Sequence, residues 1–168
     1  MMKTHSYVRK IVYIAVITAI LEAAKFALNA IANVELISLL TIVFTVYFGW
    51  QITLPALLIF AVIESLWWGI SIWTVTYFYV WPVLILLTVL LRKQMSRFTA
   101  SCLSSLFGFG FGLLCAFTTL LISGMNAAVA WWIAGIPYDL VHGVSNLVIA
   151  FVLYDPLIKA LRKLNITI

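Results

Sequence analysis

The chain has 168 residues, of which 65% are hydrophobic and only 9% are charged, and its formal net charge is +5. A soluble domain carries roughly half apolar and a quarter charged residues, so this composition predicts an all-α integral membrane protein. A spanning helix takes about 20 residues, which leaves room for roughly six or seven spans. The length therefore excludes an added nucleotide-hydrolysing module, Rossmann domain or extracellular receptor domain.

Six apolar segments are expected to form the membrane-spanning helices of a single transmembrane domain covering residues 1–168. These segments are 7–30, 35–48, 54–70, 77–91, 99–123 and 137–161. The second segment is short for a full crossing, which favours a tilted helix or one whose end is buried against protein. Gly49, Gly69, Gly124 and the Gly135–Pro137 pair fall at the expected turns.

The basic residues form three clusters that flank the apolar segments, which does not indicate a nucleic-acid partner. The clusters are Lys3, Arg9 and Lys10, then Arg92, Lys93 and Arg97, and finally Lys159, Arg162 and Lys163. The positive-inside rule places all three in the cytoplasm, so both termini are expected there. The loops 31–34, 71–76 and 124–136 are then expected outside, and the loops 49–53 and 92–97 inside.

The first segment carries a row of small residues at four-residue spacing: Ala15, Ala19, Ala23 and Ala27. Such a row lets another helix approach closely, because helix association in lipid rests on packing. Two interpretations stay open. The row packs inside this protein's own bundle, or it is a docking face for a separate membrane subunit.

Glu22 and Lys25 lie three residues apart on the same segment and are expected to pair on one helical face. An unpaired charge near the bilayer centre costs about 2.5 to 3.5 kcal/mol on insertion scales. The two charges also interrupt the apolar run that would otherwise resemble a secretory signal, so we expect the segment to be retained.

The run from Phe107 to Gly112 places Gly108 and Gly112 in a GxxxG spacing, which predicts packing against another helix of the same protein. Cys102 and Cys115 are too far apart on one segment to form a disulfide, and no ligand spacing predicts a metal or a cofactor. The sequence contains no HExxH and no nucleophile that can be paired with a base, so we expect no enzyme activity.

Polar residues concentrate at the expected outer ends of the helices. On the last segment Asp139, His142 and Asn146 are spaced three and four apart, which places them on one helical face. A hydrogen-bonded core histidine, and an Asp139 that caps its own helix after Pro137, are the simpler explanations of two of them. The aligned triple favours a ligand site, because stacked polar groups on an apolar helix need partners.

Other candidate binding residues fall at the same end of the helices. They are Asn33, Glu35, Glu64, Trp68, Trp73, Tyr77 and Trp81. An interfacial aromatic belt would also explain the rings. Carboxylates, amides, a histidine and aromatic rings on one membrane face nevertheless describe a small-molecule pocket better than a channel, which needs polar groups along the whole crossing.

The six short segments, the alanine row, the loop Asn33-Val34-Glu35-Leu36 and the run Gly135–His142 followed by Asn146 together resemble the substrate-binding S component of an energy-coupling factor (ECF) transporter. The resemblance implies a multi-pass protein of the bacterial plasma membrane that binds a vitamin-like micronutrient near the extracellular side. It implies docking through the four alanines onto a membrane T component, which is coupled to two cytoplasmic ATPases. It also implies that Asn33, Glu35, Trp73 and Tyr77 lie in or near a lid over the ligand.

Aromatic rings with two or three carboxylates favour a flat, nitrogen-containing heterocycle with hydrogen-bond donors. A thiamine-like pyrimidine, a vitamin B6 vitamer, riboflavin and a queuosine precursor all qualify, and the smaller pyrimidine or pyridine vitamins are favoured. Nickel and cobalt S components carry histidine at the second position, so Met2 argues against a metal substrate. Two other functions stay open: a small structural or assembly protein without a ligand, and a self-sufficient carrier, which the lack of inverted halves weakens.

Overall fold

The computed structural model describes the backbone of residues 2–164 and the side chains of residues 7–164, so the side chain of His5 lies outside the described residues. Within that range the chain is all-helical, as expected. The helices are α1 (Met2–Leu28), α2 (Ile37–Phe48), α3 (Trp50–Trp68), α4 (Ile72–Leu91), the short 3-10 helix η1 (Arg92–Gln94), α5 (Arg97–Phe109), α6 (Phe111–Ser123) and α7 (Met125–Lys163). Five of the described helical stretches, counting α5 and α6 as one, are long and apolar enough to cross a membrane.

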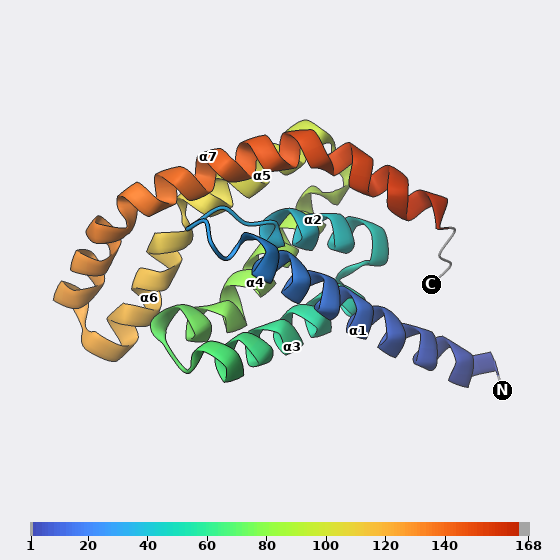
Figure 1. Cartoon of the computed structure of the whole chain (residues 1–168), viewed down its shortest axis with the longest axis horizontal. Helices are drawn as coiled ribbons and strands as arrows, with labels where there is room; N and C mark the ends of the chain where they lie inside the picture. The colour runs from blue at the N-terminus through green and yellow to red at the C-terminus, as the bar shows by residue number, and fades with distance from the viewer. Residues whose placement is uncertain (1, 165–168) are drawn as a thin grey trace.

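The α7 helix arches over the rest of the molecule, with α5 running along its underside (Figure 1). The start of α1 and the end of α7 lie at one end of the molecule, and the hairpin made by α6 and the start of α7 lies at the other. The α2 helix sits in the interior, where residues 37–45 are all buried. Burial against protein therefore explains how an apolar helix of only 12 residues is accommodated.

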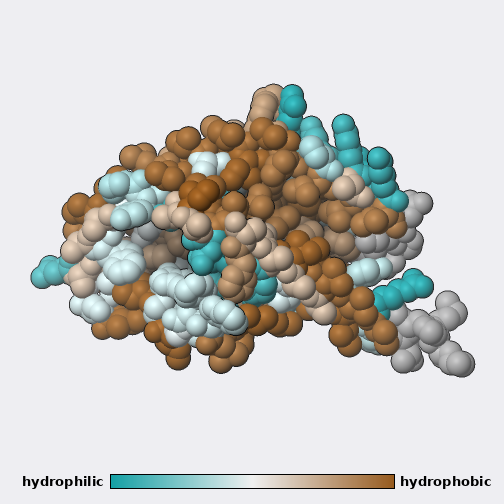
Figure 2. All heavy atoms as spheres, viewed as in Figure 1, coloured by the Kyte–Doolittle hydropathy of each residue, from teal (hydrophilic) through white to brown (hydrophobic). Residues whose placement is uncertain are grey.

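Two of the three basic clusters meet at one end of the bundle. The Arg92 guanidinium donates to the carbonyl of Val46 at 3.2 Å, and the Tyr47 hydroxyl donates to the carbonyl of Leu161 at 2.8 Å. A surface hollow at this end is lined by Arg97, Lys159 and Arg162 among others. We call this end the basic pole; Figure 2 shows teal side chains gathered there on a mostly brown surface.

The α5 and α7 helices approach each other closely where glycines face each other. A Cβ added to Gly108 would lie 2.9 Å from the backbone nitrogen of Gly143, a distance that real Cβ atoms do not show. A Cβ on Gly112 would likewise overlap the carboxylate of Asp139. The prediction that this GxxxG pair packs within the protein is confirmed.

Three expected loops are mostly helical in the structure. The α3, α4 and α7 helices begin at Trp50, Ile72 and Met125, so one, three and one residues, respectively, separate them from the preceding helices. Ser71 starts α4 through a capping box with Thr74, in which each side chain accepts from the other residue's backbone N–H. Conversely, the expected continuous helix 99–123 is interrupted at Gly110.

The α7 helix contains 39 residues, which corresponds to about 58 Å and exceeds the roughly 30 Å of a hydrocarbon core. The expectation that Gly135 and Pro137 begin a new helix at residue 137 is wrong. The preceding stretch is rich in alanine, a strong helix former, and proline bends rather than ends a helix that neighbouring helices support. Gly124, with a φ of 84°, makes the turn instead.

We expect Gly108→Ala to lower the stability of the protein, because the added methyl group collides with backbone that has no room to move. Overpacking of this kind costs about 1 to 3 kcal/mol. Gly135→Ala is the matched control, since an added Cβ there meets nothing within 4 Å. Thermal unfolding in detergent should show a lower midpoint for the first variant only; equal midpoints would contradict the close contact.

Candidate functional site

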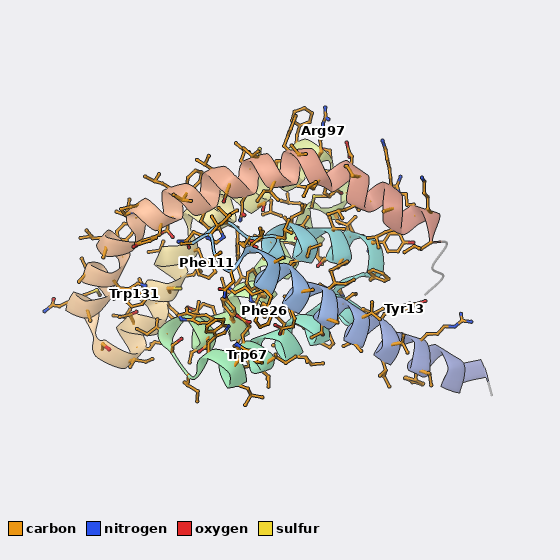
Figure 3. All side chains as sticks on the ribbon, viewed as in Figure 1. Tyr13, Phe26, Trp67, Arg97, Phe111 and Trp131 are labelled. Carbon is orange, nitrogen blue, oxygen red and sulfur yellow. The ribbon has the colours of Figure 1, made fainter. Side chains whose placement is uncertain are left out.

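A cavity of about 590 Å³ lies between the end of α1, the first turns of α4 and the hairpin of α6 and α7. This volume is in the range of small-molecule sites. The residues that line it are Lys25, Asn29, Asn33, Trp68, Trp73, Tyr77, Phe111, Gly112, Cys115, Trp131, Ala134, Gly135, Tyr138 and Asp139. Figure 3 labels Phe111 and Trp131, which contribute to its walls from α6 and from the start of α7.

A second cavity of about 150 Å³ adjoins the first and is also lined by Lys25, Asn29, Asn33, Tyr77 and Phe111. It lies beneath the segment that joins α1 to α2. Both cavities use the end of α1 and the beginning of α4, whereas the basic pole contains the end of α4. The two cavities therefore lie at the end of the bundle away from the basic pole.

The structure brings most of the candidate binding residues together. The larger cavity is lined by Asn33, Trp68, Trp73, Tyr77 and Asp139, and the smaller one adds Glu35, Trp81 and His142. Glu64 and Asn146 line neither cavity. Glu64 is buried behind Lys25, and the Asn146 amide donates to the carbonyl of Ser104 at 3.3 Å, which joins α7 to α5.

Lys25 is the cation that lines the site, and it is not among the binding residues expected from the sequence. Its expected partner was Glu22, but its Nζ lies 4.0 Å from Oε2 of Glu64 and donates to the Tyr77 hydroxyl at 3.2 Å. Nζ also lies 5.6 Å from the ring centroid of Trp73 and 5.7 Å from that of Tyr77. The signal that points to Lys25 is its isolation, since a cation inside an apolar helix is costly and marks function by default.

Asp139 caps a helix, but not its own. It lies within α7, and its Oδ1 accepts a hydrogen bond of 2.9 Å from the backbone N–H of Gly112 in the first turn of α6. A carboxylate is favourable there because it accepts from an otherwise unpaired N–H and faces the positive end of the helix dipole. Oδ2 has no hydrogen-bond partner among the described residues and is shielded from solvent, and Asp139 lines the larger cavity.

His142 and Glu35 join α7 to the segment between α1 and α2. The Nε2 atom of His142 lies 3.1 Å from Oε1 of Glu35, and the Ser38 backbone N–H donates to Oε2 at 2.8 Å. The Ser145 hydroxyl donates to the carbonyl of Asn33 at 3.1 Å. Burial raises the pKa of Glu35, but the hydrogen bonds and charge of His142 and the hydrogen bonds of Ser38 lower it more, to about 2.

A cluster of aromatic rings around Tyr77 contributes to the walls of both cavities. The Tyr77 ring lies 5.4 Å from that of Trp73, 5.2 Å from that of Trp81 and 5.8 Å from that of Phe60, between centroids. Tyr77 and Trp81 expose only 6% and 2% of their surface. An interfacial belt faces lipid, so it does not explain these two residues.

The alanine row on α1 is exposed along its whole length. Ala15, Ala19, Ala23 and Ala27 are all exposed, whereas Ile17 and Leu21 on the other side of the helix are buried. The interpretation that the row packs inside this protein's own bundle is therefore wrong. The structure leaves an exposed row of small residues on α1 that a second protein can approach.

Comparison with models of protein families, with curated proteins and with solved structures gives no match to this chain. Among the described residues, no three histidine, cysteine, aspartate or glutamate side chains come together as metal ligands. The function is therefore argued from the site alone.

The link between Glu35 and His142 predicts a specific dependence of stability on pH. The folded-state pKa of Glu35, about 2, lies below its ordinary value of 4.5. Its ionised form thus stabilises the fold fully above about pH 4.5, and this contribution is lost as the pH falls toward 2. We expect Glu35→Gln to be less stable than the wild type at pH 6 and to lose less stability down to pH 2, as measured by thermal unfolding. Parallel curves for the two proteins would contradict this role.

Proposed function

We propose that the protein is the substrate-binding S component of an ECF transporter in a bacterial plasma membrane. It captures a vitamin-like small molecule in the cavity near Lys25 and Asp139 and delivers it for ATP-driven uptake by partner subunits. One observation carries this proposal: a cavity of about 590 Å³, lined by aromatic rings and by groups of both charges, lies at the end of an apolar helical bundle away from the basic pole.

The lining favours a flat, nitrogen-containing heterocycle, of which the small pyrimidine and pyridine vitamins are the favoured examples. The Trp73 and Tyr77 rings offer faces on which a planar molecule can stack, and Phe111 and Trp131 add apolar wall. Asp139 lines the cavity and offers a negative charge to a ligand N–H group. A mostly apolar cavity with a few polar groups is typical of a small-molecule binding site.

The exposed alanine row supports the proposed coupling to a T component and two cytoplasmic ATPases. Lipid supplies no hydrophobic drive between helices, so a membrane subunit is held best where backbones approach closely. A face made of Ala15, Ala19, Ala23 and Ala27 provides that approach. The uptake energy comes from the partner ATPases in this proposal.

Native mass spectrometry of the protein purified from its own cells tests the proposed binding. We expect a small aromatic molecule to accompany the wild type. Asp139→Asn should retain at least about tenfold less of it, since a neutral acceptor replaces a charged one at the cavity. Asp155→Asn on the same helix at the basic pole is the control and should retain the molecule fully. A wild type without any bound molecule would instead favour a structural or assembly protein.

Replacing Ala23 and Ala27 by leucine tests the proposed docking face. The larger side chains keep another helix at a distance, so we expect the double variant to lose co-purification with the membrane partner while retaining its small molecule. Ala130→Leu is the control, because Ala130 is an exposed alanine of α7 far from α1 in the sequence. Undiminished co-purification of the double variant would contradict docking through α1, and uptake by the protein alone would favour a self-sufficient carrier.

A further inference from the structure

Lys25 has hydrogen-bonding capacity that the protein does not use. An ammonium group has three N–H donors. One is directed to the Tyr77 hydroxyl at 3.2 Å, and no other hydrogen bond from Nζ to a described residue is present. The 4.0 Å separation from Oε2 of Glu64 is an ion pair but is too long for a hydrogen bond.

The Lys25 ammonium group, with its unused N–H donors, lies at the two cavities. Its side chain is 26% exposed, lines both cavities, and lies near the rings of Trp73 and Tyr77. Glu64, by contrast, is 1% exposed and lines neither cavity. A molecule bound in the larger cavity therefore meets the ammonium group and not the carboxylate behind it.

Asp139 supplies the opposite charge in the same cavity. Its Oδ1 is held by the Gly112 N–H at 2.9 Å, which fixes the carboxylate, and its Oδ2 is shielded from solvent. The larger cavity is thus lined by one cationic and one anionic side chain. A ligand that satisfies both has an acidic group and an N–H group on one aromatic frame.

From this arrangement we propose that Lys25 binds a carboxylate of the ligand, so that the substrate class is an aromatic nitrogen heterocycle carrying both a carboxylate and an N–H donor. This inference rests on the proposed function and narrows it. The alternative role for Lys25 is purely structural, as the counter-charge that allows Glu64 to be buried.

Two matched probes separate these roles: 6-aminonicotinate, and 6-aminonicotinamide, in which an amide replaces the carboxylate. Both carry the amino and ring-nitrogen edge that suits Asp139. Dissociation constants are measured by NMR titration of each probe with the purified wild type and variants. We expect the wild type to bind the carboxylate about tenfold more tightly than the amide, because a charge-assisted hydrogen bond is stronger than a neutral one.

The variants assign that preference to Lys25. Lys25→Gln should bind both probes equally, and Lys25→Arg should keep the preference. The double variant Lys25→Gln with Glu64→Gln also removes the buried charge that pairs with Lys25, so it keeps the comparison valid if the single variant unfolds. It should also show no preference. Lys93→Gln at the basic pole is the matched control and should behave as the wild type.

The inference is overturned if the wild type binds neither probe or binds both equally, if Lys25→Gln keeps the preference, or if the double variant regains it. The last result would assign Lys25 the structural role. These outcomes are distinct from failure of the proposed function, which is the absence of any bound small molecule in the protein purified from its own cells.

Discussion

The close approach of α7 to α5 and α6 is the constraint on which the rest of the structure depends. Gly108 and Gly143 allow the backbones to meet, and Gly112 leaves room for the Asp139 carboxylate. One polar stripe on α7 then reaches three other parts of the chain. Asp139 binds the start of α6, His142 binds the segment before α2 through Glu35, and Asn146 binds α5. In a medium without water, burying polar side chains that lack partners would destabilise the protein, and these hydrogen bonds within the protein avoid that cost.

The two ends of the molecule differ in the chemistry of their side chains. Basic side chains gather where α2, η1 and the end of α7 meet, and no cavity residue comes from that end. If the positive-inside rule sets the orientation, the cavities lie toward the outside. The segment between α1 and α2 lines the smaller cavity and is held by the hydrogen bond between Glu35 and His142. An uptake protein that binds its ligand outside the cell needs its binding cavity at the outer end, opposite the basic pole.

The spacing of residues in the sequence predicts the features that depend on a single helix. The shared face of Asp139, His142 and Asn146, and the packing of Gly108, follow from spacing alone. Partners across helices did not follow, because pairing of Lys25 with Glu64 and capping of α6 by Asp139 are set by tertiary packing. The predicted start of α7 at residue 137 is wrong because Gly135 and Pro137 do not end a helix here; an alanine-rich stretch continues the helix through them.

An experimentally determined structure of the protein purified from its own cells tests the central claim most directly, which is that the cavity beside Lys25 and Asp139 holds a small molecule. The account predicts density for a planar molecule against Trp73 and Tyr77, with polar contacts to Nζ of Lys25 and to the carboxylate of Asp139. Density for water or lipid alone in this cavity, or a small molecule bound elsewhere on the protein, would contradict it.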